Sequence, residues 1–154
     1  MDAAATYLVV IDDSPESRVA MRFAVLRAAH VDADVVLASV IDVAGFLQFG
    51  AVQSAMAAQA RGEAEALLAE LAGEAAAMGA RLPTTLVLEG DPAASVLAHV
   101  KANPGIRALV LGTPARGGPG PLVGYFTGER AGSLPCILML VPGGLDADRL
   151  GRLA

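Results

Sequence analysis

The segment Ala108-Leu109-Val110-Leu111-Gly112 is apolar throughout and leads into a loop rich in glycine and proline, residues 113–124. A short, continuous apolar run is typical of a parallel strand that is buried on both faces. Ligands of parallel sheets bind just beyond the carboxyl ends of the strands, and glycine lets the main chain approach a phosphate closely. A surface loop in which glycine and proline only interrupt regular structure explains the same residues equally well, because the loop lacks a Walker or dinucleotide fingerprint.

Four other apolar runs resemble this one, and segments with helical periodicity lie between them. The five predicted strands cover residues 7–11, 35–41, 84–88, 107–111 and 136–141. Strands that alternate with helices form right-handed βαβ units, so the sequence predicts an α/β protein with an open, doubly wound sheet of five parallel strands and helices on both faces. The expected strand order, 3-2-1-4-5, places Asp12 and the loop after Gly112 together at the switch point of the sheet.

The helix after the first strand has clear start signals. Ser14 can cap its N-terminus, Pro15 suits the first helical position, and Glu16 complements the positive end of the helix dipole. A long alanine-rich helix is predicted over residues 52–78, and Gly79 is expected to end it.

Three segments are assigned less directly. Residues 43–50 contain Phe46, Leu47 and Phe49 and are interpreted as either a lid over a pocket or an apolar plug before the next helix. A short helix is predicted over residues 125–131. Residues 145–154 are interpreted as a charged C-terminal tail without an assigned structure.

Composition limits the classes of function. The 154 residues suit a single domain, residues 1–154, and the net charge of −5 argues against nucleic acid as a partner. The N-terminus lacks a basic secretory segment and no apolar run reaches membrane-spanning length, so a cytoplasmic protein without a membrane partner is expected. Cys136 is the single cysteine, which excludes an internal disulfide, and no clustered set of metal ligands is present in the sequence.

The order and spacing of several motifs resemble the universal stress protein family from Tyr7 to Pro142. The motifs are Val10-Ile11-Asp12-Asp13-Ser14, Ser39-Val40-Ile41-Asp42, Gly90-Asp91-Pro92 and the fourth strand with its glycine loop. The resemblance implies a pocket like that of the nucleotide-binding members. There, an aspartate after the first strand and a valine after the second hold adenine, and the glycine loop holds the ribose and phosphates. The candidate site residues are therefore Asp12, Val40, Leu111, Gly112, Ala115, Arg116, Gly118, Gly124, Tyr125 and Thr127.

The loop departs from the family pattern in three places. Ala115 replaces the second glycine, Gly124 ends the loop one residue early, and Tyr125 occupies the serine position, whereas Thr127 matches. Alanine disfavours a positive φ, which weakens the predicted phosphate cradle. Arg116 supplies a cation that offsets part of this loss.

Three functions follow as hypotheses. The first is a stress-response regulator that binds an adenine nucleotide, ATP or AMP, weakly and without fast turnover, with Mg²⁺ accompanying ATP. The second is a dimeric interaction protein with a lapsed pocket, that is, a pocket that no longer binds a nucleotide. The third, an enzyme, is not favoured, because the sequence offers no catalytic residues: no nucleophile lies at a plausible spacing from a base.

The resemblance also implies a homodimer through antiparallel pairing of the last strand, residues 136–141, across a two-fold axis. Protein partners are not indicated.

Overall fold

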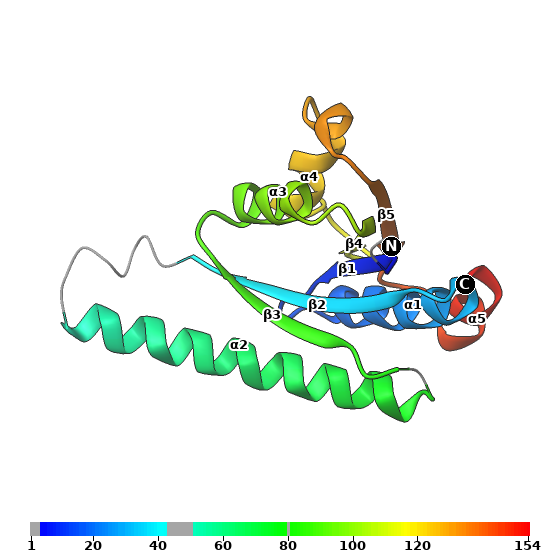
Figure 1. The fold of residues 1–154 in the computed structure, drawn as a ribbon, viewed down its shortest axis with the longest axis horizontal. Helices are drawn as coiled ribbons and strands as arrows, with labels where there is room; N and C mark the ends of the chain where they lie inside the picture. The colour runs from blue at the N-terminus through cyan, green and yellow to red at the C-terminus, as the bar shows by residue number, and fades with distance from the viewer. Residues whose placement is uncertain (1–3, 43–50, 80) are drawn as a thin grey trace.

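The computed structural model describes residues 4–42, 51–79 and 81–154. Their five parallel strands form one sheet in the order β3-β2-β1-β4-β5 (Figure 1). The strands are β1 (Thr6–Val10), β2 (Asp34–Ile41), β3 (Thr84–Glu89), β4 (Ile106–Thr113) and β5 (Ile137–Pro142). This topology confirms the predicted strand order. The predicted lid or plug, residues 43–50, lies outside the described residues.

Helices cover both faces of the sheet, as predicted (Figure 1). Helices α1, α2 and α5 lie on one face, and α3, α4 and a short 3₁₀ turn lie on the other. The helices are α1 (Pro15–Val31), α2 (Ala51–Ala77), α3 (Pro92–Ala102), α4 (Pro121–Thr127), η1 (Ala131–Ser133) and α5 (Ala147–Leu153).

The central strand β1 shows why the apolar runs are continuous. Tyr7 and Val9 pack into the core beneath α1, while Leu8 and Val10 pack into the core beneath α3 and α4. All four side chains are buried. Because helices cover both faces of this parallel sheet, neither face of the strand is exposed to solvent, and its sequence does not alternate between apolar and polar residues.

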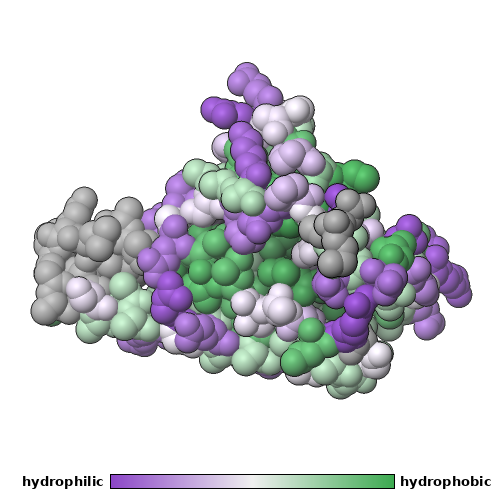
Figure 2. Space-filling view, viewed as in Figure 1, coloured by the Kyte–Doolittle hydropathy of each residue, from purple (hydrophilic) through white to green (hydrophobic). Residues whose placement is uncertain are grey.

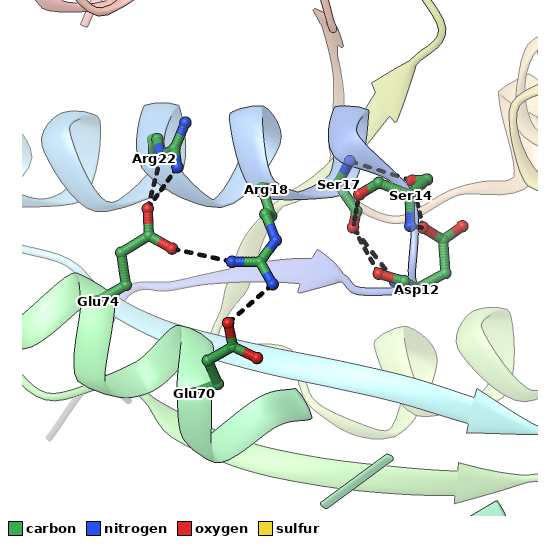
Figure 3. A network of polar contacts seen from close by, with 7 residues as sticks. All are labelled: Asp12, Ser14, Ser17, Arg18, Arg22, Glu70 and Glu74. Carbon is green, nitrogen blue, oxygen red and sulfur yellow. Dashed lines mark hydrogen bonds and ion pairs between the residues drawn. The ribbon is translucent and has the colours of Figure 1, made fainter. Parts of the chain in front are cut away.

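An ion-pair network fixes how α2 lies against α1 (Figure 3). The Arg18 guanidinium contacts Glu70 at 2.9 Å and Glu74 at 3.4 Å, and Arg22 contacts Glu74 at 2.6 Å. The hydrogen bond that Arg18 donates to Glu70 raises the pKa of Arg18, so this side chain stays charged at any physiological pH. Exposed pairs of this kind contribute little to stability, so their main effect is on the orientation of the two helices.

Two segments near the C-terminus differ from the sequence interpretation. Helix α4 was predicted over residues 125–131 but spans Pro121–Thr127, because Pro121 takes the first helical position after Gly120. The charged tail contains α5, which Asp146 caps by accepting a hydrogen bond from the Arg149 N–H. Leu150 of α5 is buried in the core beneath α1, so the segment is part of the domain.

The last residue also contacts α1. The Arg27 guanidinium donates a hydrogen bond to the main-chain oxygen of Ala154 at 3.1 Å, and the Nδ1 atom of His30 lies 2.8 Å from the same oxygen. His30 therefore has a structural contact in the last turn of α1.

Cover over the α3 face of the sheet is incomplete. Figure 2 shows apolar surface between α2 and α3, where β2 and β3 run in Figure 1. On the α3 side of the sheet, Val36 of β2 and Leu86 and Leu88 of β3 pack against the core but are only partly buried. Within the described ranges, no helix combines the length and apolar character needed to cross a membrane.

The glycines inside α2 offer a simple stability test. An added Cβ at Gly73 would meet no atom within 4 Å, and the residue lies in the helix interior. We expect Gly73→Ala to raise the free energy of unfolding by about 0.5–1 kcal/mol, because alanine loses less backbone entropy in a helix. Urea denaturation measures the change, and the matched variant Ala69→Gly, at an exposed position of the same helix, should lower stability by a similar amount. Equal stability of both variants would contradict the prediction.

Candidate functional site

A cleft of about 240 Å³ opens at the switch point of the sheet, where β1 and β4 end. The first turns of α1, α3 and α4 all contribute to its wall, because each of these helices follows a strand or loop at this edge. The lining residues are Val10, Ile11, Asp12, Ser14, Glu16, Ser17, Val40, Pro92, Leu111, Gly112, Pro114, Gly120, Pro121, Leu122 and Val123. The wall is thus mainly apolar, with two carboxylates and two hydroxyl groups.

The polar side chains at the start of α1 are already hydrogen-bonded to one another (Figure 3). Oδ1 of Asp12 accepts hydrogen bonds from the N–H of Ser14, at 2.9 Å, and from the Ser14 hydroxyl. The Ser14 Oγ in turn accepts a hydrogen bond from the N–H of Ser17, so Ser14 caps the helix as predicted. The Ser17 hydroxyl donates to the main-chain oxygens of Asp12, at 2.8 Å, or Ser14, at 3.0 Å.

Glycine is required at position 112 because the main chain of β4 packs directly against the first turn of α1. A Cβ at this position would overlap the carbonyl oxygen of Glu16 and lie 2.5 Å from its carbonyl carbon. Gly143, after β5, faces the same turn, since a Cβ there would lie 2.9 Å from both the Glu16 Cβ and the Thr113 oxygen. The first turn of α1 therefore sits directly on the ends of β4 and β5, which closes one side of the cleft.

The main chain of Val40 faces the cleft. The N–H of Ile11 donates to the carbonyl of Ala38 at 2.7 Å, so Ala38 directs its polar groups towards β1. Main-chain groups alternate along a strand, and Val40 therefore directs its N–H and C=O to the same side. Because the register of β1 with β2 ends at Val10 and Ala38, those groups point into the space beyond β1.

These observations fit one known family. The model of the universal stress protein family matches residues 6–142. The chain belongs to this family. Membership identifies it as a stress-response protein and accounts for the predicted resemblance, which ran from Tyr7 to Pro142. Among curated proteins, none matches the chain.

Solved universal stress proteins share the fold. The protein UspA from Lactobacillus plantarum superimposes with a TM-score of 0.74 at 20% identity, covering 92% of this chain and 99% of that one. A family member from Burkholderia pseudomallei gives 0.69 at 20% identity, with 90% and 96% covered. A universal stress protein in complex with cAMP gives 0.62 at 20% identity, with 93% and 100% covered.

Four of the ten candidate site residues of this universal stress protein line the cleft: Asp12, Val40, Leu111 and Gly112. The other six do not form its wall. Ala115, Arg116 and Gly118 lie exposed in the loop before α4. Gly124, Tyr125 and Thr127 lie within α4, where the Tyr125 ring packs against Phe126 and Arg130, and the Thr127 hydroxyl donates to the Val123 oxygen at 2.6 Å.

Sequence reasoning missed several lining residues. Ser14 and Glu16 were interpreted as helix-start signals and Ser14 and Pro92 as parts of family motifs, but none of them as a site residue. A signal was present, however, because the first turn of a helix that follows a parallel strand lies at the same edge as the strand's carboxyl end. Pro15, Pro92 and Pro121 each start a helix, and each marks a turn at this edge.

A second cleft, of about 440 Å³, lies against α2. It shares Ile11, Asp12 and Val40 with the first cleft, and Asp13 and Glu63 add two carboxylates. The rest of its wall consists of small or apolar residues and Ser39, whose hydroxyl donates to the Ile11 oxygen. It is larger than the first cleft but contains no part of the glycine loop, so we assign the candidate site to the first.

Proposed function

We propose that this universal stress protein is a cytoplasmic stress-response regulator that holds an adenine nucleotide weakly in the switch-point cleft, without fast turnover. The observation that carries the proposal is the convergence of Asp12, Val40, Leu111 and Gly112 on one cleft at the place where doubly wound sheets bind ligands. The structural neighbour that contains cAMP supports adenine as the base.

The cleft suits a flat base with polar edges. Apolar side chains from β1, β4 and α4 supply faces for stacking, among them Val10, Leu111 and Leu122. The N–H and C=O of Val40 offer one donor and one acceptor side by side, which matches the edge of adenine. The Asp12 carboxylate adds a second acceptor at the rim.

The loop after β4 supports weak phosphate binding. Ala115 and Arg116 lie outside the cleft wall, and Pro114, Pro119 and Pro121 supply no N–H. Loss of two phosphate hydrogen bonds at ~1 kcal/mol each weakens binding about thirtyfold. We therefore expect affinities weaker than those of a family member with an intact loop.

Neither the cysteine nor a histidine is among the residues that line the cleft, which supports the absence of fast turnover. Burial raises the pKa of the Cys136 thiol and lowers the pKa of His99, so neither is poised as a charged nucleophile or acid at neutral pH. Among the residues that the structure describes, no cluster of three metal-ligating side chains occurs. Any Mg²⁺ in the cleft would then arrive with ATP, through the ligand's own phosphates.

Calorimetry with ATP, AMP and adenosine at millimolar concentration tests the proposal. We expect heat of binding for at least one of these ligands in the wild type, and none in Leu122→Trp, which fills the cleft. Leu153→Trp, at an exposed position of α5, is the matched control and should bind as the wild type does. ATP recovered after the titration should be intact. Lack of binding by all three ligands would favour the lapsed-pocket alternative.

The alternative, an interaction protein that works through its dimer surface, has one observation in its favour. β5 is an edge strand of the sheet, and its Ile137 and Leu140 are 64% and 41% exposed. An exposed apolar edge readily pairs with another chain. We propose a homodimer through this strand in either case, so dimerisation alone does not separate the two functions.

A further inference from the structure

The charged side chains that line the cleft determine which ligand charge it can accommodate. Asp12 and Glu16 line the wall, and no lysine, arginine or histidine is among the lining residues. Arg116, the cation of the glycine loop, lies exposed outside the wall. A phosphate in the cleft would therefore meet two carboxylates without a compensating positive side chain.

The N-termini of α1 and α3 do not change this balance, and α4, which also begins at this edge, is only seven residues long and has Pro121 at its first position. Glu16 lies in the first turn of α1, and Asp91 caps α3 by accepting from the Ala94 N–H at 2.9 Å. Each carboxylate already neutralises the partial positive charge of its own helix end. Proline at the first position of both helices also removes one N–H donor from each end.

The hydroxyl groups of the wall offer little to an anion either. The Ser14 hydroxyl donates to Asp12, and the Ser17 hydroxyl donates to a main-chain oxygen of the preceding turn. The side-chain groups that remain at the polar side of the cleft are carboxylate oxygens, which accept hydrogen bonds and do not donate them. Ribose hydroxyls and an exocyclic amine are donors and match these oxygens, whereas phosphate oxygens are acceptors and do not.

From this chemistry we propose that the cleft selects an uncharged nucleoside over its phosphorylated forms. The proposal rests on the proposed function, because it concerns the same cleft and the same base. The cleft's size agrees with a small ligand, since about 240 Å³ lies below the roughly 300–1,000 Å³ typical of sites for larger molecules. The phosphates of ATP would then add repulsion and little or no attraction.

A charge series of ligands tests the proposal by equilibrium dialysis or calorimetry, at low ionic strength and with a chelator. The series is adenosine, cAMP, AMP and ATP, in which the negative charge increases stepwise while the base stays the same. Adenosine, AMP and ATP also share the free ribose hydroxyls, whereas the 3′ oxygen of cAMP is part of its cyclic phosphate. We expect adenosine to bind most tightly and ATP about tenfold more weakly, because unscreened carboxylates repel each added charge. The difference should shrink as salt is added.

Three variants show which charged residues cause the difference in affinity between ATP and adenosine. Glu16→Gln keeps the shape of the side chain and should strengthen ATP binding about fivefold relative to adenosine, since it removes one negative charge from the wall. Asp13→Asn removes the same charge three residues earlier in the chain, at a side chain that does not line this cleft, and is the matched control. Arg116→Ala should leave the order of affinities unchanged.

The outcomes separate this inference from the proposed function. ATP binding tighter than adenosine, with or without Mg²⁺, overturns the inference and leaves nucleotide binding standing. Selective loss of ATP binding in Arg116→Ala has the same meaning. Absence of binding by every ligand of the series overturns both. The wild-type series decides the question even where a variant does not fold.

Discussion

Gly112→Ala should destabilise the protein by about 3 kcal/mol or more, although it adds only one methyl group. The added Cβ would overlap the main chain of Glu16 at the first turn of α1. A flexible side chain can move away from such a contact, but this turn is held by the hydrogen bonds among Asp12, Ser14 and Ser17. The helix would have to shift away from β4, which opens the core beneath α1.

Urea denaturation measures this loss, and circular dichroism shows whether the variant folds at all. Gly118→Ala in the same loop is the matched control, because its Cβ would meet no atom within 4 Å and its φ is not positive. The control should lie within about 0.5 kcal/mol of the wild type. Similar stability of the two variants would mean that α1 does not sit on Gly112 in solution.

Leu140→Pro should convert the proposed homodimer into a monomer. The N–H of Gly143 donates to the Thr113 carbonyl at 2.7 Å, so Gly143 and, by alternation, Val141 and Met139 direct their main-chain groups towards β4. Leu140 therefore directs its N–H away from the sheet, to the edge where a second copy would pair. Proline at this position removes that donor and leaves the hydrogen bonds between β4 and β5 intact.

Light scattering at micromolar concentration tests the dimer prediction. We expect a dimer for the wild type, a dimer for Leu140→Val, which keeps the N–H, and a monomer of unchanged fold for Leu140→Pro. Met139→Pro is not a useful test, since it removes an N–H that faces β4 and so disrupts the sheet itself. A monomeric wild type, or a Leu140→Pro variant that remains dimeric, would exclude pairing through β5.

The strands and their order were predictable because burial on both faces leaves a strong signal in the sequence. β1 shows this most clearly, since every residue from Tyr7 to Val10 enters one of the two cores. The start of α4 was missed because Gly120 and Pro121 were interpreted as loop residues, although proline at the first helical position is itself a start signal. The structure of the charged tail depends on Leu150 reaching α1, a contact that local pattern does not contain.

The candidate site was predictable only in part. Topology alone brings Asp12 to Gly112, and the structure places both at one cleft. The role of Gly112 was not predictable, because a glycine that approaches a ligand and one that approaches a helix look the same in sequence. Glu16 changes the electrostatics of the site, yet its contribution appears only when α1 is seen to begin on the ends of β4 and β5.

The pairing of β1 with β4 also has a kinetic consequence. Thr6 pairs with Asp34 on one side and with Ile106 on the other, so the two neighbours of the central strand lie very different distances along the chain. Contacts between distant segments form late, because a long loop must close before they stabilise anything. During synthesis, β1, α1 and β2 can associate while β4 is still being made, and the cleft can exist only after β4 has arrived. A ligand that binds there favours the forms in which β4 has joined the sheet, and so stabilises the products of this late, long-range step of folding.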